Sequence, residues 1–265
     1  MATKVTFIIT TLWLSIVYCE NLGEPLGKYL YNDMKCSPNY DEVNNKLTSY
    51  KCDFNTNNGC MFEGKRFSVG QNINDNGTDL YCRSNCVCVE DGLFSCAEDD
   101  CPSPAPGCRL RDTLTDCCGV QDCKPPKSKC IYKGKTYLEG TSFYVQDQCM
   151  SCVCQEGFKG KLEEPYCIKR RCLEQIFGND NLQNKCAAVY FKTALCCPAT
   201  WVCHEKQEIV KISQQTESTS GETCEFGNVK VPYGHGFETS VRPFSKQVKV
   251  KCECTLPPLV TCLEV

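Results

Sequence analysis

Cysteine is the residue type whose number and spacing carry the most chemistry in this chain. The sequence has 27 cysteines among 265 residues. A cysteine sulfur can form a disulfide, bind zinc as a thiolate, or act as a nucleophile. A density of about one residue in ten is typical of small disulfide scaffolds, which form in oxidising compartments. We therefore expect these cysteines to be paired.

The order of the cysteines repeats along the chain. Each of two series runs as an isolated Cys, a C-x2/3-C-x-C cluster, a C-x4-C pair, a further Cys, a CC doublet and a last Cys. The first series is Cys60, Cys82, Cys86, Cys88, Cys96, Cys101, Cys108, Cys117, Cys118 and Cys123. The second is Cys130, Cys149, Cys152, Cys154, Cys167, Cys172, Cys186, Cys196, Cys197 and Cys203. The pattern predicts two tandem repeats, 60–123 and 130–203.

Catalytic and metal chemistry have little support in the sequence. His204 and His235 are the two histidines, and neither lies in a motif that would position an imidazole beside a nucleophile. The C-x2-C spacing of Cys149 and Cys152 occurs in zinc ribbons. Disulfides are favoured over zinc at these two cysteines, because we expect the chain to be secreted and to contain an even number of cysteines once its signal peptide is removed. We expect no enzyme activity, no metal and no cofactor.

The N-terminus indicates export. Lys4 precedes an apolar run, Val5–Val17, that is short for a membrane span. We interpret residues 1–19 as a signal peptide, cut between Cys19 and Glu20. Removing Cys19 leaves 27 − 1 = 26 cysteines, an even number. We therefore expect a secreted chain without a transmembrane segment.

The rest of the chain divides around the repeats. We expect an irregular N-terminal arm at 20–59, closed by a Cys36–Cys52 disulfide, and a flexible linker at 204–223. A last unit, 224–265, carries Cys224, Cys252, Cys254 and Cys262. Units of this size bury too little apolar surface to depend on a core alone, so cross-links must supply much of their stability.

The repeats open alike, with Cys60 or Cys130 followed by aromatics and glycines in the pattern C-x-[FY]-x-G-x-x-[FY]-x-x-G. This pattern predicts a short twisted hairpin in which Gly64 or Gly134 occupies a turn or bulge. The C-x-C step then predicts a third strand. The second half of each repeat lacks periodicity and predicts loops held by disulfides. The fold class is small, disulfide-rich and mostly β with irregular loops, and no helix is expected.

These motifs resemble the von Willebrand factor type C domain. The resemblance covers 60–123 and 130–203 in full, through the C-x-[FY]-x-G opening, the C-x2/3-C-x-C cluster and the closing CC doublet. The unit 224–265 matches only the front half of the pattern, because it lacks the second cysteine and everything after the fifth.

The resemblance implies a pairing of first with fourth, second with eighth, third with fifth, sixth with ninth and seventh with tenth. In repeat one this gives Cys60–Cys88, Cys82–Cys117, Cys86–Cys96, Cys101–Cys118 and Cys108–Cys123. In repeat two it gives Cys130–Cys154, Cys149–Cys196, Cys152–Cys167, Cys172–Cys197 and Cys186–Cys203. The partial unit would close as Cys224–Cys254 and Cys252–Cys262.

Function is implied by the same resemblance. Type C modules occur in extracellular proteins similar to chordin, crossveinless and kielin-type regulators, which bind growth factors of the bone-morphogenetic-protein and TGF-β type. The front of a module and the segment before it contact the ligand, which here indicates Phe62, Phe67, Val69 and Ile73, although Phe62 and Phe67 also suit a small hairpin core. The alternatives are a matrix or adhesive spacer, and a protease inhibitor or defence factor with 102–107 as its exposed loop.

Charge is uneven between the repeats. Residues 60–123 hold 5 Lys/Arg and 11 Asp/Glu, whereas 124–203 hold 12 and 7. A basic cluster in the second repeat predicts either an ordinary solvated loop or a glycosaminoglycan site, and it consists of Lys159, Lys161, Lys169, Arg170 and Arg171. The net charge of −3 gives no support for nucleic-acid binding. Asn76 lies in the one N-x-[ST] sequon and is the expected glycosylation site.

Overall fold

A computed structural model describes residues 24–54, 59–73, 83–204, 208–212, 222–243 and 246–265. The predicted signal peptide and the sequon at Asn76 lie outside these residues. Strands predominate, and they are short. The N-terminal arm contains α1 (Lys28–Asp33), β1 (Ser37–Tyr40) and β2 (Leu47–Lys51). Module 1, residues 60–123, contains β3 (Cys60–Phe62), β4 (Lys65–Phe67), β5 (Arg83–Cys88), η1 (Glu90–Gly92), β6 (Phe94–Glu98), β7 (Arg109–Arg111) and β8 (Val120–Asp122).

Module 2, residues 130–203, has the same front half and a different back half. Its front elements are β9 (Lys129–Tyr132), β10 (Lys135–Leu138), β11 (Ser142–Val145), η2 (Gln146–Gln148), β12 (Met150–Val153) and β13 (Cys167–Lys169). Its back elements are α2 (Glu174–Phe177), α3 (Asn179–Gln183), β14 (Ala187–Tyr190) and β15 (Thr200–Val202). The C-terminal part contains β16 (Val210–Lys211), β17 (Thr223–Phe226), β18 (Val229–Pro232), β19 (His235–Val241), β20 (Val248–Glu253) and β21 (Thr261–Glu264).

The opening hairpins form as the aromatic and glycine pattern predicts. β3 pairs with β4 and β9 with β10, both antiparallel. The turns place Gly64 at φ 74° and Gly134 at φ 77°, in the left-handed region that glycine enters without a steric penalty. The aromatic side chains then face the module's interior. In module 2, for example, Tyr137 stacks on Phe143 with ring centroids 4.3 Å apart.

Twelve disulfides lie within the described residues, and each joins a pair that the resemblance implies or that was expected in the arm and the last unit. The thirteenth expected pair is Cys82–Cys117. Cys82 lies outside the described residues, and Cys117 is disulfide-bonded.

Complete pairing remains a prediction that one measurement checks. We expect thiol labelling of the secreted chain under denaturing, non-reducing conditions to modify no cysteine, because Cys82 is the natural partner of Cys117. The same labelling after reduction is the positive control. A cysteine that is labelled reproducibly without reduction would show that one of the thirteen bonds is absent.

The absence of helices was a wrong expectation. Three short α-helices occur within the described residues, one in the arm and two in the back half of module 2. Each has four to six residues, which is too short to show a helical period in the sequence. Their buried side chains come from tertiary packing, which stabilises helices that would not form alone.

The C-terminal unit is joined to module 2 by a shared sheet. The sheet has the strand order β15-β14-β21-β20-β19-β16 among the described residues. Its junction is the parallel pairing of β14 with β21, in which Val189 lies opposite Cys262. β16 comes from the segment expected to be a linker, and it pairs with β19. The expectation that 224–265 is structurally separate from module 2 is therefore wrong, because the sheet crosses this boundary. Residues 205–207 and 213–221 of the expected linker lie outside the described residues.

Both faces of this sheet are covered. On one face, the β17–β18 hairpin contributes Phe226, which is fully buried and stacks on Phe237 at 4.8 Å. On the other, α1 of the arm contributes Leu30 and Tyr31, which pack with Tyr190 of β14. The Tyr31 hydroxyl accepts a hydrogen bond from the Leu259 amide at 3.1 Å. The arm is thus part of the C-terminal core rather than an irregular extension.

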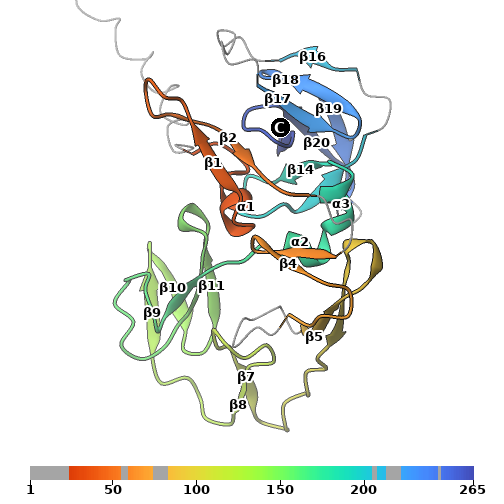
Figure 1. Ribbon diagram of the computed structural model, residues 1–265. Helices are drawn as coiled ribbons and strands as arrows, with labels where there is room; N and C mark the ends of the chain where they lie inside the picture. The colour runs from red at the N-terminus through yellow and green to blue at the C-terminus, as the bar shows by residue number, and fades with distance from the viewer. Residues whose placement is uncertain (1–23, 55–58, 74–82, 205–207, 213–221, 244–245) are drawn as a thin grey trace, which may run out of the picture.

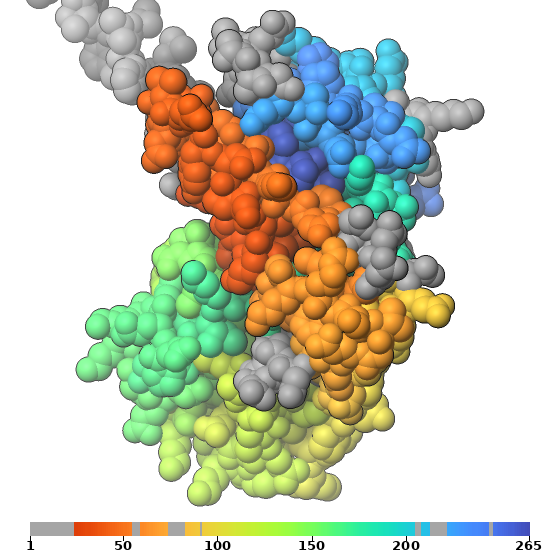
Figure 2. Space-filling model, in the orientation of Figure 1, coloured from red at the N-terminus to blue at the C-terminus, as the bar shows by residue number. Residues whose placement is uncertain are grey.

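Figure 1 shows the result of these pairings: the arm, β14 and β17–β20 gather at one end of the molecule, β7–β11 lie at the other, and α2 and β4 lie between. In the space-filling view of Figure 2, the arm runs along the surface from the C-terminal unit to both modules. Among the described residues, no helix has the length and apolar character needed to cross a membrane.

Candidate binding surfaces

The front half of module 1 is covered by other parts of the chain. Phe62 and Ile73 are 5% and 8% exposed. They form a core with Leu173 and Ile176, which belong to the α2 region of module 2. Phe67 is half-buried and packs edge-to-face against Phe94 at 5.9 Å. These three side chains are therefore core residues in this structure and not surface contacts.

Val69 differs from the other three predicted contacts. It lies in the turn after β4 and is 55% exposed. The sequence placed Val69 and Ile73 together as surface contacts, yet the structure separates them because Ile73 points into the core that α2 completes. Of the four predicted contacts, Val69 alone is exposed.

The front hairpin of module 2 has a closed inner face and an exposed outer face. Its inner face is closed by Tyr132, Tyr137 and Phe143. Its outer face carries Ile131, 68% exposed, and Leu138, 47% exposed. Cross-strand partners share a face of a hairpin, and the pairs here are Ile131 with Thr136 and Leu138 with Lys129. Ile131 and Leu138 therefore form an apolar pair beside Lys129 on an exposed two-stranded surface. The sequence analysis missed this surface, although both residues alternate along the strands with the inward-facing aromatics.

The predicted basic cluster is divided between two environments. Lys159, Lys161 and Lys169 are exposed. Arg171 forms an ion pair of 2.7 Å with Glu63 of module 1 and lies over the Phe62 ring at 5.3 Å. Arg170 lies over the Tyr144 ring at 4.8 Å. The two arginines therefore contribute to packing, and only the three lysines match the expected surface cluster.

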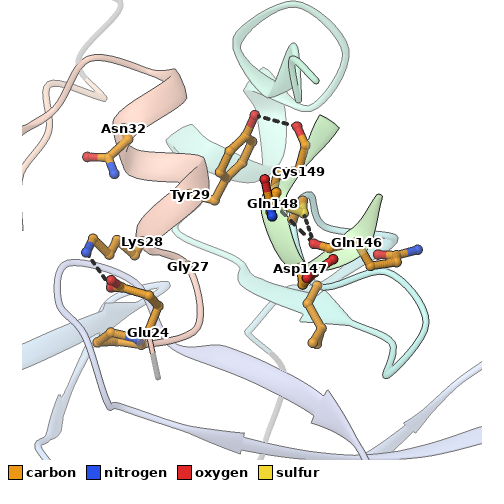
Figure 3. A pocket seen from close by; sticks show the side chains of 12 residues that line it. Glu24, Gly27, Lys28, Tyr29, Asn32, Gln146, Asp147, Gln148 and Cys149 are labelled. Atoms are coloured by element: carbon orange, nitrogen blue, oxygen red, sulfur yellow. Dashed lines mark hydrogen bonds and ion pairs between the residues drawn. A yellow bond between two sulfur atoms is a disulfide. The ribbon is translucent and has the colours of Figure 1, made fainter. Parts of the chain in front are cut away.

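The arm and module 2 line an open cavity of about 350 Å³. Figure 3 shows α1 on one side and the η2 segment on the other. Tyr29 crosses between them, because its hydroxyl donates to the Arg170 carbonyl and lies 3.3 Å from the Cys149 carbonyl. Lys28 pairs with Glu24 at the rim. The contacts that line this cavity fix the arm to module 2.

The cysteines that could bind a metal or act as nucleophiles are disulfide-bonded. The sulfurs of Cys101, Cys117 and Cys118 lie within 4.8 Å of one another, but Cys101 is bonded to Cys118 and Cys117 is itself disulfide-bonded. Oxidised sulfurs are not thiolate ligands. Cys149 and Cys152, with zinc-ribbon spacing, are bonded to Cys196 and Cys167.

The two histidines lie in different structural settings. His204 packs edge-to-face on Phe226 at 5.3 Å. His235 begins β19, and its Nδ1 lies 3.3 Å from the Tyr233 carbonyl. Each ring therefore has a local structural contact, and neither is placed beside a nucleophile by the hydrogen bonds of the described residues.

Comparison with known proteins supports the module assignment. Chordin-like protein 1 of Homo sapiens is 28% identical over 131 residues, covering 43% of this chain and 27% of that protein. The von Willebrand factor C and EGF domain-containing protein of Mus musculus is 37% identical over 73 residues, covering 27% of this chain and 7% of that protein. The chain is thus similar over part of its length to proteins that contain von Willebrand factor type C modules.

The similarity is partial in both directions. Cysteine-rich motor neuron 1 protein of Danio rerio is 34% identical over 74 residues, covering 28% of this chain and 7% of that protein. The chain thus spans less than a third of the length of each of these relatives. No family model and no solved structure matches it.

Proposed function

We propose that this protein is a secreted, non-enzymatic binding protein that contacts growth factors of the bone-morphogenetic-protein or TGF-β type. The disulfide framework fits an oxidising extracellular setting, and relatives that share type C modules include chordin-like proteins. The observation that carries the proposal is the exposed outer face of the β9–β10 hairpin, where Ile131 and Leu138 lie on the surface.

Charge and geometry favour this face as the main contact. Lys129 is exposed on the same face, opposite Leu138, so an acidic partner would be attracted before apolar contact forms. Module 1 offers a smaller surface, because its aromatic core is covered by α2 and Val69 is its one exposed member of the expected contact set. The proposed contact therefore moves from module 1 to module 2.

The test is binding of the full chain to a panel of growth factors by surface plasmon resonance. Replacing Ile131 and Leu138 by Asp places charges in an apolar contact, and we expect a loss of about 2 kcal/mol or more. The matched control is Val120→Asp, since Val120 is 42% exposed on the β7–β8 hairpin of module 1. Equal affinity of the double variant and the wild type would contradict the proposed site.

Protease inhibition is a second candidate, supported by one loop. Residues 102–107 are exposed, and Cys101 and Cys108 at the two ends of this stretch are bonded to Cys118 and Cys123. A rigid exposed loop of this kind suits insertion into a protease cleft. A panel of serine proteases, assayed with the same protein, separates the candidates. Inhibition without growth-factor binding would favour this second function, and no response in either panel would favour a matrix or spacer protein.

Glycosaminoglycan attachment is a further part of the proposal. It depends on Lys159, Lys161 and Lys169, because Arg170 and Arg171 pack within the protein. An attachment through exposed lysines weakens as salt rises, since charges in water are screened. The proposed glycan at Asn76 would lie in module 1, away from this cluster in sequence.

A further inference from the structure

A nine-residue segment of module 2, 171–179, holds three parts of the molecule together, and we call it the clasp segment. It contains α2 and its flanking residues. Toward module 1, it inserts Leu173 and Ile176, which are 2% and 6% exposed, into the core formed by Phe62 and Ile73. In Figure 1, α2 accordingly lies between the C-terminal unit and the strands of module 1.

Polar contacts to module 1 accompany this apolar contact. The Glu63 amide donates to Gln175 Oε1 at 2.7 Å, and Asn179 Nδ2 donates to the Gly92 carbonyl at 2.6 Å. Gln175 and Asn179 are 7% and 5% exposed. Buried polar groups without partners are costly, so these bonds favour one specific arrangement of the clasp segment on module 1.

On its other side, the clasp segment contacts the arm and the shared sheet through two carboxyl groups. Asp33 of α1 accepts a hydrogen bond from the Cys172 amide at 2.9 Å. Glu174 of α2 accepts one from the Trp201 indole of β15 at 3.1 Å. Burial raises the pKa of Asp33. Burial raises the pKa of Glu174 to about 7, and the negative charge of Asp33 adds to that effect.

The other charged and titratable groups around this junction are accounted for. Two arginines lie at this junction: the Arg171 guanidinium pairs with Glu63 at 2.7 Å, and Arg83 of β5 lies over the Phe177 ring at 5.1 Å and pairs with Glu98 at 3.5 Å. Tyr31 and Tyr190 are the nearby phenols, both fully buried, and burial raises the pKa of each above its ordinary value. The phenols are therefore neutral across the physiological range. Glu174 is then the group whose charge changes near neutral pH.

We propose that the clasp segment is a pH-sensitive latch, which holds module 1 against the C-terminal unit while Glu174 is protonated and loosens when Glu174 ionises beside Asp33. A charged Glu174 would be partly removed from water and opposed by the negative charge of Asp33, and both effects favour release of the segment into solvent. The latch covers Phe62, Phe67 and Ile73, so its release uncovers the apolar front of module 1.

The direction of the pH dependence follows from linkage. Glu174 has a higher pKa in the closed state than in solvent, where a glutamate titrates near about 4.3. Closing of the clasp segment therefore takes up a proton. The stability that protonated Glu174 gives to the closed state is fully present below the pKa of a glutamate in solvent, and it is lost as pH rises through about 7. The equilibrium constant for opening should rise by up to about tenfold per pH unit between the solvent pKa of glutamate and about pH 7, and it should level off above about pH 7.

The test is amide hydrogen exchange of the full disulfide-bonded chain from pH 5 to 8, corrected for the intrinsic pH dependence of exchange. Peptides covering 60–67 and 171–179 report opening, because the Glu63 amide is bonded to Gln175. Glu174→Gln keeps an oxygen for the Trp201 indole but cannot ionise, so its corrected opening constant should be flat over this range. Glu156→Gln removes an exposed carboxyl and should keep the wild-type slope.

A second variant keeps the inference testable if Glu174→Gln does not fold. Trp201→Phe removes the donor that stabilises the Glu174 carboxylate, so the midpoint of the pH dependence should move upward. Equal slopes in the wild type and Glu174→Gln would overturn the latch. So would a midpoint that Trp201→Phe leaves unchanged, or greater protection at pH 8 than at pH 6.

Discussion

A chain that ends after Cys203 is expected to lose the native structure of the back half of module 2. β14 is buried at all four positions, Ala187–Tyr190. Truncation removes β21, which pairs with it, and β17–β18, which cover one face of the sheet. Hydrogen exchange should show that residues 186–203 lose protection, while the front half of module 2, which has its own disulfides and its own core around Phe143, keeps its protection.

The loss should be severe because burial is concentrated at this junction. Phe226 is fully buried against Phe237, and a Phe→Ala change in such a core costs about 3–5 kcal/mol. Truncation removes both rings together with Val231, Val250 and Val260. A point variant, Phe226→Ala in the full chain, serves as a milder control. Native protection of 186–203 in the truncated chain would show that the shared sheet is unnecessary for folding.

The disulfide framework and the front halves were predictable because their signals are local or repeated. The two ten-cysteine series indicate the modules, and the aromatic and glycine spacing around Gly64 and Gly134 indicates the hairpins that the structure contains. These features lie within a few residues of one another. A short hairpin and its turn can therefore be read from one sequence.

The shared sheet was harder to predict from the sequence, because it depends on contacts between distant segments. The run Ala187–Tyr190 is a continuous apolar stretch of the kind found in strands buried on both faces, and it was the available signal for β14. Its partner, β21, is about 75 residues further along, and sequence alone gives no register between them. The same holds for α1, whose Tyr31 is bonded to Leu259.

The burial of three of the four predicted ligand contacts could not be predicted for a related reason. Phe62, Phe67, Val69 and Ile73 are equally apolar in sequence, and their exposure is decided by a helix that comes about 100 residues later. The basic cluster divides in the same way, since Arg171 has its partner, Glu63, in module 1. Residues of one type within a short segment thus have different roles because of distant contacts.

Replacing Ile73 by Asp is expected to destabilise the folded chain by about 3–5 kcal/mol, whereas Val69→Asp should change stability by less than about 0.5 kcal/mol. Ile73 is 8% exposed in the core that Leu173 and Ile176 complete, so a carboxylate there has no counter-charge in that apolar cluster. Val69 is 55% exposed, and its replacement leaves the new charge in water.

The measurement is reversible denaturant unfolding of the two variants and the wild type, with disulfides intact and at a single pH. Ile73→Val is the matched control for shape, since it removes one methyl group and should cost about 0.5–1.5 kcal/mol. Because the core spans both modules, Ile73→Asp should also increase hydrogen exchange in 171–179, far along the chain. If Ile73→Asp and Val69→Asp are equally stable, the front of module 1 is not packed against module 2, and both residues are free to contact a ligand.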